Sequence, residues 1–154
     1  MKVIRLLAVA VLAAAVSVGF AHADAKKLTQ DEVKALTTKA AGLVAAQGID
    51  AAAKVFNADG EFKFGEVYVN VIDMNGVWLC YPPKPEGVGK SVLNVKDADG
   101  KFLVQDIIKV AKEKGEGWVE YRWMNPATHQ IQPKLTYLHR VPGKDMIAYI
   151  GIYK

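Results

Sequence analysis

Apolar residues recur at helical spacing from Thr29 as far as Gly48, which predicts one long amphipathic helix. Thr29 is followed three residues later by Glu32, the capping-box pattern that begins a helix. A shorter, alanine-rich helix is expected from Asp50, as its N-cap, to about Asn57. Two helices are therefore predicted before any strand.

The hydrophobic period changes to two from Glu66, where valines alternate with other substantial side chains over residues 67–72. Such a strand is expected at the centre of a sheet that is covered on both faces. Asn75-Gly76 follows and is typical of a type I′ hairpin turn, so a second strand is expected from Val77. Residues 81–89 contain too many prolines and glycines for regular structure and are predicted to be a loop.

The remaining chain is predicted to contain one more helix and three strands. Asp97-Ala98-Asp99-Gly100 is typical of a turn, and a helix is expected over residues 102–114, ended by Gly115. The strands are predicted at 117–124, 134–141 and 146–153. Strands joined by short turns, with helices apart from them, indicate the α+β class with an antiparallel sheet.

The N-terminus has the pattern of a secretory signal peptide. Lys2 and Arg5 precede a short apolar run over residues 6–20, and Ala21-His22-Ala23 offers small residues at both recognition positions. We expect cleavage after Ala23, which leaves one domain over residues 24–154 in a soluble periplasmic protein; an uncleaved anchor is the alternative.

Charge and cysteine content narrow the possible partners. Loss of the two basic residues in 1–23 lowers the formal net charge from +4 to +2, and the remaining charges are interspersed. No basic patch for nucleic acid is expected. A single cysteine, Cys80, cannot form an intramolecular disulfide, and its apolar neighbours favour burial over an intermolecular link.

The sequence lacks the common motifs of enzymes and cofactor proteins. It contains no GxSxG, Walker, HExxH, CxxC or CxxCH pattern, so neither catalysis nor a bound metal or cofactor is expected. A Cys80 nucleophile with His129 or His139 as base has no local support. Residues 97–100 resemble a calcium loop only superficially, because the glycine comes too early and the closing glutamate is missing.

Aromatic and hydrogen-bonding side chains are dense on the predicted C-terminal strands. Period two places Tyr121 and Trp123 on one face of their strand, and Lys134 and Tyr137 on opposite faces of the next. These side chains could form an ordinary core with solvated cations, or a small pocket with aromatic walls and one cation for an anion. From the residues alone, both interpretations stay open.

The order of motifs resembles the single Cache domain family, over nearly all of residues 24–154. The matching segments are Phe64 to Asp73, Asn75-Gly76, Tyr81-Pro82 with Gly89-Lys90, Asp97 to Lys101, Gly115 to Trp123, Lys134 to Tyr137 and Ile150 to Tyr153. The resemblance implies a PAS-like fold, with a long N-terminal helix behind a five-stranded antiparallel sheet. Members usually form extracytoplasmic sensors in chemotaxis and signal transduction, and many bind small organic acids.

The resemblance implies a sensor-type module that binds a small organic molecule, with a short-chain carboxylate as the leading ligand. Because the sequence ends at Lys154, we expect a free-standing periplasmic form that acts with a separate membrane receptor, a histidine kinase or a chemoreceptor. The alternative is an interaction protein with a filled Cache fold that binds no ligand. The long N-terminal helix could pair in a homodimer.

Six residues are predicted to contact the ligand. Many relatives carry His-Pro where this chain has Tyr81-Pro82, which replaces a titratable donor with a phenol. Lys134 would hold the anion, and the tyrosines would add neutral donors. The full set is Tyr68, Tyr81, Tyr121, Trp123, Lys134 and Tyr137.

Overall fold

The structure, a computed structural model, describes residues 27–154, so the predicted signal peptide lies outside the described residues. Helices and strands follow the predicted order, with one two-residue strand and one 3-10 turn in addition. They are α1 (Gln30–Gln47), α2 (Ile49–Asn57), β1 (Lys63–Phe64), β2 (Val67–Asp73), β3 (Trp78–Cys80), η1 (Pro85–Gly87), α3 (Leu103–Lys114), β4 (Glu116–Met124), β5 (Ile131–Arg140) and β6 (Met146–Tyr153).

The predicted capping box begins α1. The Thr29 side chain accepts a hydrogen bond from the Glu32 backbone, and the Glu32 carboxylate accepts one from the Thr29 backbone at 2.9 Å. The prediction that Asp50 caps α2 is wrong, because α2 already begins at Ile49 and Asp50 lies in its first turn. Gly48, with φ of +81°, reverses the chain between the helices within one residue.

The sheet is antiparallel in the order β1-β2-β6-β5-β4. The short strand β3 also pairs with part of β2, along the edge of β2 that faces away from β6. It contains the five predicted strands and the short β1 in addition. β5 begins three residues earlier than predicted and includes Pro133, whose carbonyl accepts a hydrogen bond from the Lys154 N–H near the end of the strand.

The β2–β3 hairpin forms, but its turn is not type I′. Gly76 has φ of +77°, whereas Asn75 is not among the described residues with positive φ. The Asp73 carboxylate accepts hydrogen bonds from the Asn75 and Val77 backbone N–H groups, at 2.9 and 2.8 Å. A longer turn that ends at one left-handed glycine therefore replaces the predicted two-residue turn.

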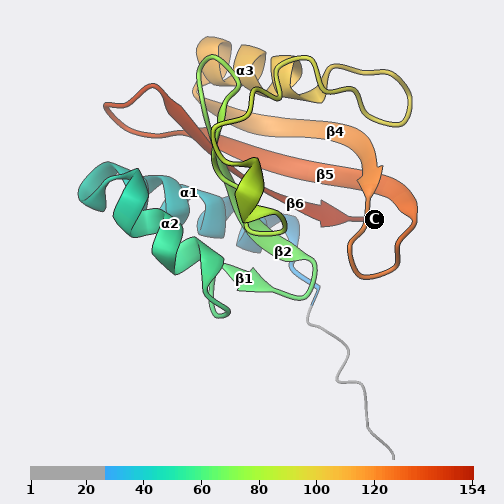
Figure 1. The fold of residues 1–154 in the computed structure, drawn as a ribbon, viewed down its shortest axis with the longest axis horizontal. Coiled ribbons are helices and arrows are strands. Elements are labelled where there is room, and N and C mark those ends of the chain that lie inside the picture. Colours follow the sequence, from blue (N-terminus) through green and yellow to red (C-terminus); the bar gives the residue numbers. More distant parts are fainter. Residues whose placement is uncertain (1–26) are drawn as a thin grey trace, which may run out of the picture.

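The two faces of the sheet are buried by different elements (Figure 1). α1 and α2 cover one face, and α3 together with the segment between β3 and α3 covers the other. Cys80 is buried in the first of these cores, as predicted, and burial raises the pKa of its thiol to about 11. The second core surrounds the candidate site.

Candidate ligand-binding site

A small cavity lies between the sheet and the segment that follows β3. Its volume is about 30 Å³, room for about two water molecules. Strands β2, β4 and β6 supply its floor, and the apolar side chains of the loop and of α3 close its other side. The lining residues are Tyr68, Asn70, Trp78, Tyr81, Val92, Val95, Leu103, Val104, Tyr121, Trp123 and Tyr149.

Lys134 is a buried cation beside this cavity. Its side chain starts on β5, is 1% exposed, and donates a hydrogen bond to the Tyr68 hydroxyl at 2.8 Å. The ammonium nitrogen also lies 4.4 Å from the Tyr68 ring centroid and 4.6 Å from that of Tyr153. No carboxylate of residues 27–154 forms an ion pair with it. Burial lowers the pKa of Lys134 to about 7, and the more distant Glu66 carboxylate acts weakly in the opposite direction.

Tyr121 and Trp123 form the β4 wall of the site. Their rings pack edge to face with centroids 6.3 Å apart, as alternate residues on one strand face can. The Thr136 hydroxyl donates to the Tyr121 hydroxyl at 3.1 Å. Burial raises the pKa of Tyr121 to about 12, and the Thr136 hydrogen bond acts against it. The Tyr121 phenol therefore stays neutral at physiological pH.

Trp78 and Tyr81 form the roof. Their rings stack at a centroid separation of 4.1 Å, and Gly87 packs directly against the indole, where an added Cβ atom would lie 3.0 Å from the ring. Among residues 27–154 the buried Trp78 indole N–H has no hydrogen-bond partner of ordinary geometry, although it lies close enough to the Tyr149 hydroxyl to act as a donor toward it and to lower its pKa. An unsatisfied buried donor of this kind costs roughly 1–3 kcal/mol.

The site has more hydrogen-bond donors than acceptors. Burial raises the pKa of the Tyr81 phenol, while the Trp123 indole and the Tyr68 hydroxyl, as donors toward it, act in the opposite direction. None of the residues that line the cavity is acidic. The combination of neutral donors, one buried ammonium and no carboxylate is suited to an anion.

The structure brings five of the six predicted residues together. Four of them line the cavity, and Lys134, which is not itself a lining residue, is hydrogen-bonded to the hydroxyl of one of them, Tyr68. Tyr137 is on the other face of the sheet, where its ring packs edge to face with Trp118 and lies 5.5 Å from the Lys34 ammonium of α1. The reason is the period of two, which turns Tyr137 away from Lys134.

Three polar residues of the site escaped the sequence prediction. Trp78 and Asn70 lie on the two strands of the hairpin, and Tyr149 lies on β6. The alternation along 67–72 places Asn70 on the same face as Tyr68, so that signal was present in the sequence. Trp78 has no such signal, because its direction depends on the irregular pairing of β3 with β2.

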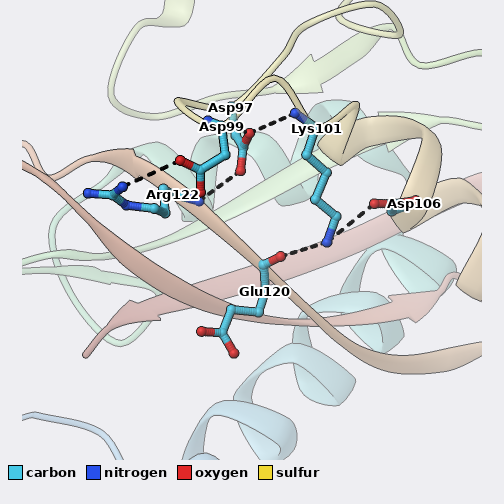
Figure 2. Close-up of polar contacts among 6 residues, drawn as sticks. All are labelled: Asp97, Asp99, Lys101, Asp106, Glu120 and Arg122. Atoms are coloured by element: carbon cyan, nitrogen blue, oxygen red, sulfur yellow. Dashed lines mark hydrogen bonds and ion pairs between the residues drawn. The ribbon is translucent and has the colours of Figure 1, made fainter.

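The turn at 97–101 ties the cover of the cavity to β4 (Figure 2). Both oxygens of the Asp97 carboxylate are used: Oδ1 accepts from the Asp99 and Lys101 backbone N–H groups, and Oδ2 accepts from the Arg122 N–H at 3.0 Å. The Lys101 ammonium donates to the Glu120 carbonyl at 2.8 Å. The predicted polar turn is confirmed, and it has a structural role in holding the loop against the sheet.

Residues 27–154 contain no group of three or more histidine, cysteine or acidic side chains placed to hold a metal ion. They also contain no helix that combines the length and the apolarity needed to cross a bilayer.

An antiparallel sheet with helices on one face and a loop-covered aromatic pocket on the other is the architecture of PAS-like sensor domains. The chain belongs to the single Cache domain family, because the family model described as Single Cache domain 2 matches residues 8–154. The resemblance inferred from the sequence is thus confirmed.

Solved structures of similar domains support the assignment. The periplasmic sensor domain of a chemotaxis protein has a TM-score of 0.71 and 25% identity, over 80% of this chain and 94% of that domain. A Cache chemosensory domain described in terms of carboxylic acid recognition has a TM-score of 0.64 and 25% identity, over 80% of this chain and 86% of its own.

A curated relative contains a similar segment in a larger protein. The sensor histidine kinase MctS of Rhizobium johnstonii is 29% identical over 86 residues, which are 56% of this chain. The matched segment is 18% of that kinase's length, so the chain corresponds to a small part of it. The family is one of sensor domains and occurs in both chemotaxis proteins and histidine kinases.

Proposed function

We propose that this domain binds a small organic anion, with a short-chain carboxylate as the leading ligand, in the cavity beside Lys134. The observation that carries the proposal is a fully buried lysine side chain that has no ion-pair partner among residues 27–154, hydrogen-bonded to a residue of a cavity lined by neutral donors. A buried charge is costly unless an opposite charge accompanies it. A carboxylate in the cavity would supply that charge.

The neighbouring donors add specificity for oxygen atoms. A carboxylate can accept several hydrogen bonds, and the indole N–H of Trp78 is an unused donor at the cavity. The aromatic walls would contact the short apolar part of the ligand. Recognition of carboxylic acids by a structurally similar Cache domain is consistent with this proposal.

The volume of the cavity limits the size of the ligand. A cavity of about 30 Å³ accommodates the smallest carboxylates only after the lining side chains, or the segment between β3 and α3, move outward. The same small volume favours the alternative function, an interaction protein whose fold is filled by its own aromatic side chains. Ligand binding itself distinguishes the two functions.

A thermal-shift experiment on the full chain tests the proposal. Sodium acetate and sodium propionate are compared with sodium chloride at equal ionic strength, and a ligand at a hundred times its Kd should add about 2.7 kcal/mol of stability. That gain corresponds to a shift of several degrees in a domain of this size. Absence of a shift with every carboxylate would favour the filled fold.

A substitution of Lys134 identifies the site. Lys134→Met keeps most of the length of the side chain, removes the charge and should abolish the shift. Replacement of a buried charge by an apolar group is often tolerated by the fold. Lys109→Met is the matched control on the exposed face of α3 and should leave the shift intact. A normal shift in Lys134→Met would show that the anion binds elsewhere.

The proposal includes export and a signalling partner. Cleavage after Ala23 would release the domain into the periplasm, the compartment named for a structural neighbour. A histidine kinase or a chemoreceptor is the proposed partner class, and catalysis by the domain is not part of the proposal. Intact-mass measurement of periplasmic protein checks the cleavage, and retention of residues 1–23 would contradict it.

A further inference from the structure

We propose that Gly151 is a positioning residue of the anion site: its missing side chain leaves the space through which Lys134 crosses β6 to reach Tyr68. The inference rests on the proposed function and assigns a role to a residue that contacts no ligand itself. Gly151 lies on β6, the strand between β2 and β5.

The register of the sheet places Gly151 beneath the lysine side chain. On the β5 side, Gly151 is paired with Thr136. Two residues along β5, Lys134 is paired with Tyr153 of β6. On the other side Val69 pairs with Ile150, so continuing this register by one residue sets Tyr68 beside Gly151. The lysine must therefore run diagonally over the glycine to reach the Tyr68 hydroxyl.

The space above Gly151 is already occupied. A Cβ atom at this position would overlap Lys134 Cε and the Thr136 hydroxyl oxygen, and would lie 3.1 Å from Lys134 Cδ. Gly151 is not among the glycines with positive φ, so the backbone conformation there does not require glycine. A glycine inside a strand is unfavourable in itself, and close approach of another group is the usual reason for one.

Two hydrogen-bonded pairs of the site depend on this space. One is Lys134 with Tyr68, at 2.8 Å, and the other is Thr136 with Tyr121, at 3.1 Å. A methyl group at position 151 would push against Lys134 in the first pair and against Thr136 in the second. A single substitution at Gly151 should therefore disturb both hydrogen bonds. Since Tyr68 and Tyr121 line the cavity, the displacement would be transmitted to the ligand.

Gly117 provides a matched control for Gly151→Ala. It also lies in a strand, on the same face as Val119 and Tyr121, and a Cβ atom there would come within 2.8 Å of Val110 Cγ1 on α3. Gly117→Ala therefore introduces a single and milder overlap in the same core, away from the lysine. It should lower stability without altering the anion site.

The experiment compares the wild-type chain, Gly151→Ala and Gly117→Ala by calorimetry with sodium acetate. We expect the affinity of Gly151→Ala for acetate to fall by about tenfold or more, as loss of a charge-assisted hydrogen bond does, and that of Gly117→Ala to stay near wild type. Equal affinity in Gly151→Ala and wild type would overturn the proposal.

A second measurement needs no ligand. The NMR signal of the Lys134 side chain, identified by its absence in Lys134→Met, is titrated with pH in each protein. We expect the midpoint to move in Gly151→Ala, because the ammonium leaves its place beside Tyr68, and to stay unchanged in Gly117→Ala. An unchanged midpoint in Gly151→Ala would overturn the inference, whereas absence of acetate binding in wild type would count against the proposed function alone.

The double variant Gly151→Ala with Thr136→Ala covers the case in which the single variant does not fold. It removes the overlap with the hydroxyl and keeps the overlap with the lysine stem. We expect it to fold, with the Lys134 midpoint displaced. If the double variant also fails to fold, Gly151 serves the fold and not the site, and the proposal is wrong.

Discussion

The Asp97 carboxylate accepts a hydrogen bond from the Arg122 backbone N–H across 25 positions of the chain, at 3.0 Å. This contact joins the turn that precedes α3 to the outer strand β4, and it is accompanied by two further N–H donors within the turn. Since Val95 and Leu103, on either side of the turn, line the cavity, the carboxylate holds the cover of the site in place.

Asp97→Ala should destabilise the domain by roughly 3 kcal/mol, because three backbone donors lose a charged acceptor and hydrogen bonds of this kind are each worth about 1.5–3 kcal/mol without being additive. Urea unfolding measures the change. Asp99→Ala is the control, since its ion pair with Arg122 is exposed and exposed pairs contribute about 0–1 kcal/mol. Equal losses in the two variants would contradict the role of Asp97.

Acid should loosen the same contact. Burial acts to raise the pKa of Asp97, but the N–H groups of Arg122, Lys101 and Asp99 outweigh burial, and the pKa lies below its ordinary value. A carboxyl group whose folded pKa is lowered contributes stability above its unfolded pKa, near 4, and loses that contribution as pH falls through the folded value. Wild type should therefore lose more stability below about pH 4 than Asp97→Asn does, in urea unfolding at several pH values.

Lys134 should give a dependence of the same sign in the unliganded protein, but at higher pH. Its pKa of about 7 lies below the value of about 10.4 in an unfolded chain, so between these values the unfolded chain binds more protons. The free energy of unfolding should therefore rise with pH from about 7 to about 9 more steeply in wild type than in Lys134→Met. Identical slopes would show that the lysine is not desolvated.

Anion binding should weaken as the lysine loses its proton. The affinity for acetate is expected to fall between about pH 6 and pH 8, because the neutral amine no longer attracts the carboxylate. Glu66 is the acidic group that acts on Lys134. The phenols that contact Lys134 or line the cavity have raised pKa values and stay neutral in this range: Tyr68, Tyr81, Tyr121, Tyr149 and Tyr153. Calorimetry at constant ionic strength checks this, and a constant affinity would contradict it.

The capping box of α1 should contribute to stability apart from the site. Thr29→Ala removes the side-chain oxygen that accepts from Glu32 and should cost about 1 kcal/mol in urea unfolding. Thr38→Ala is the control within the same helix, because Thr38 is exposed and bonds only back to the Lys34 carbonyl. That substitution should be neutral or slightly stabilising.

Local patterns predicted most of the fold because they report short-range physics. The capping box at Thr29 and the alternation after Glu66 depend on neighbouring residues, and both appear in the structure where expected. Asp50 and the Asn75-Gly76 turn were assigned wrongly, since the glycine at 48 and the Asp73 carboxylate provide better local solutions. Such competition between adjacent caps and turns is decided by one or two hydrogen bonds.

The candidate site was only partly predictable, because it depends on which strands become neighbours. Period two separates Lys134 from Tyr137, so the sequence already argued against placing both in one site. The contact of Lys134 with Tyr68 requires the order β2-β6-β5, which brings together residues 66 positions apart. The part played by Asp97 likewise depends on a strand that follows it by 25 positions.

The turn at 97–101 also has a consequence for association between molecules. β4 is the last strand of its side of the sheet, and an uncovered outer strand offers its backbone to a strand of another chain. Here the Arg122 N–H is bonded to Asp97, the Arg122 carbonyl accepts from Ala98, and the Glu120 carbonyl accepts from the Lys101 ammonium. The turn thus occupies the edge of β4 at Glu120 and Arg122, and it should disfavour pairing of this part of the strand with a strand of another molecule.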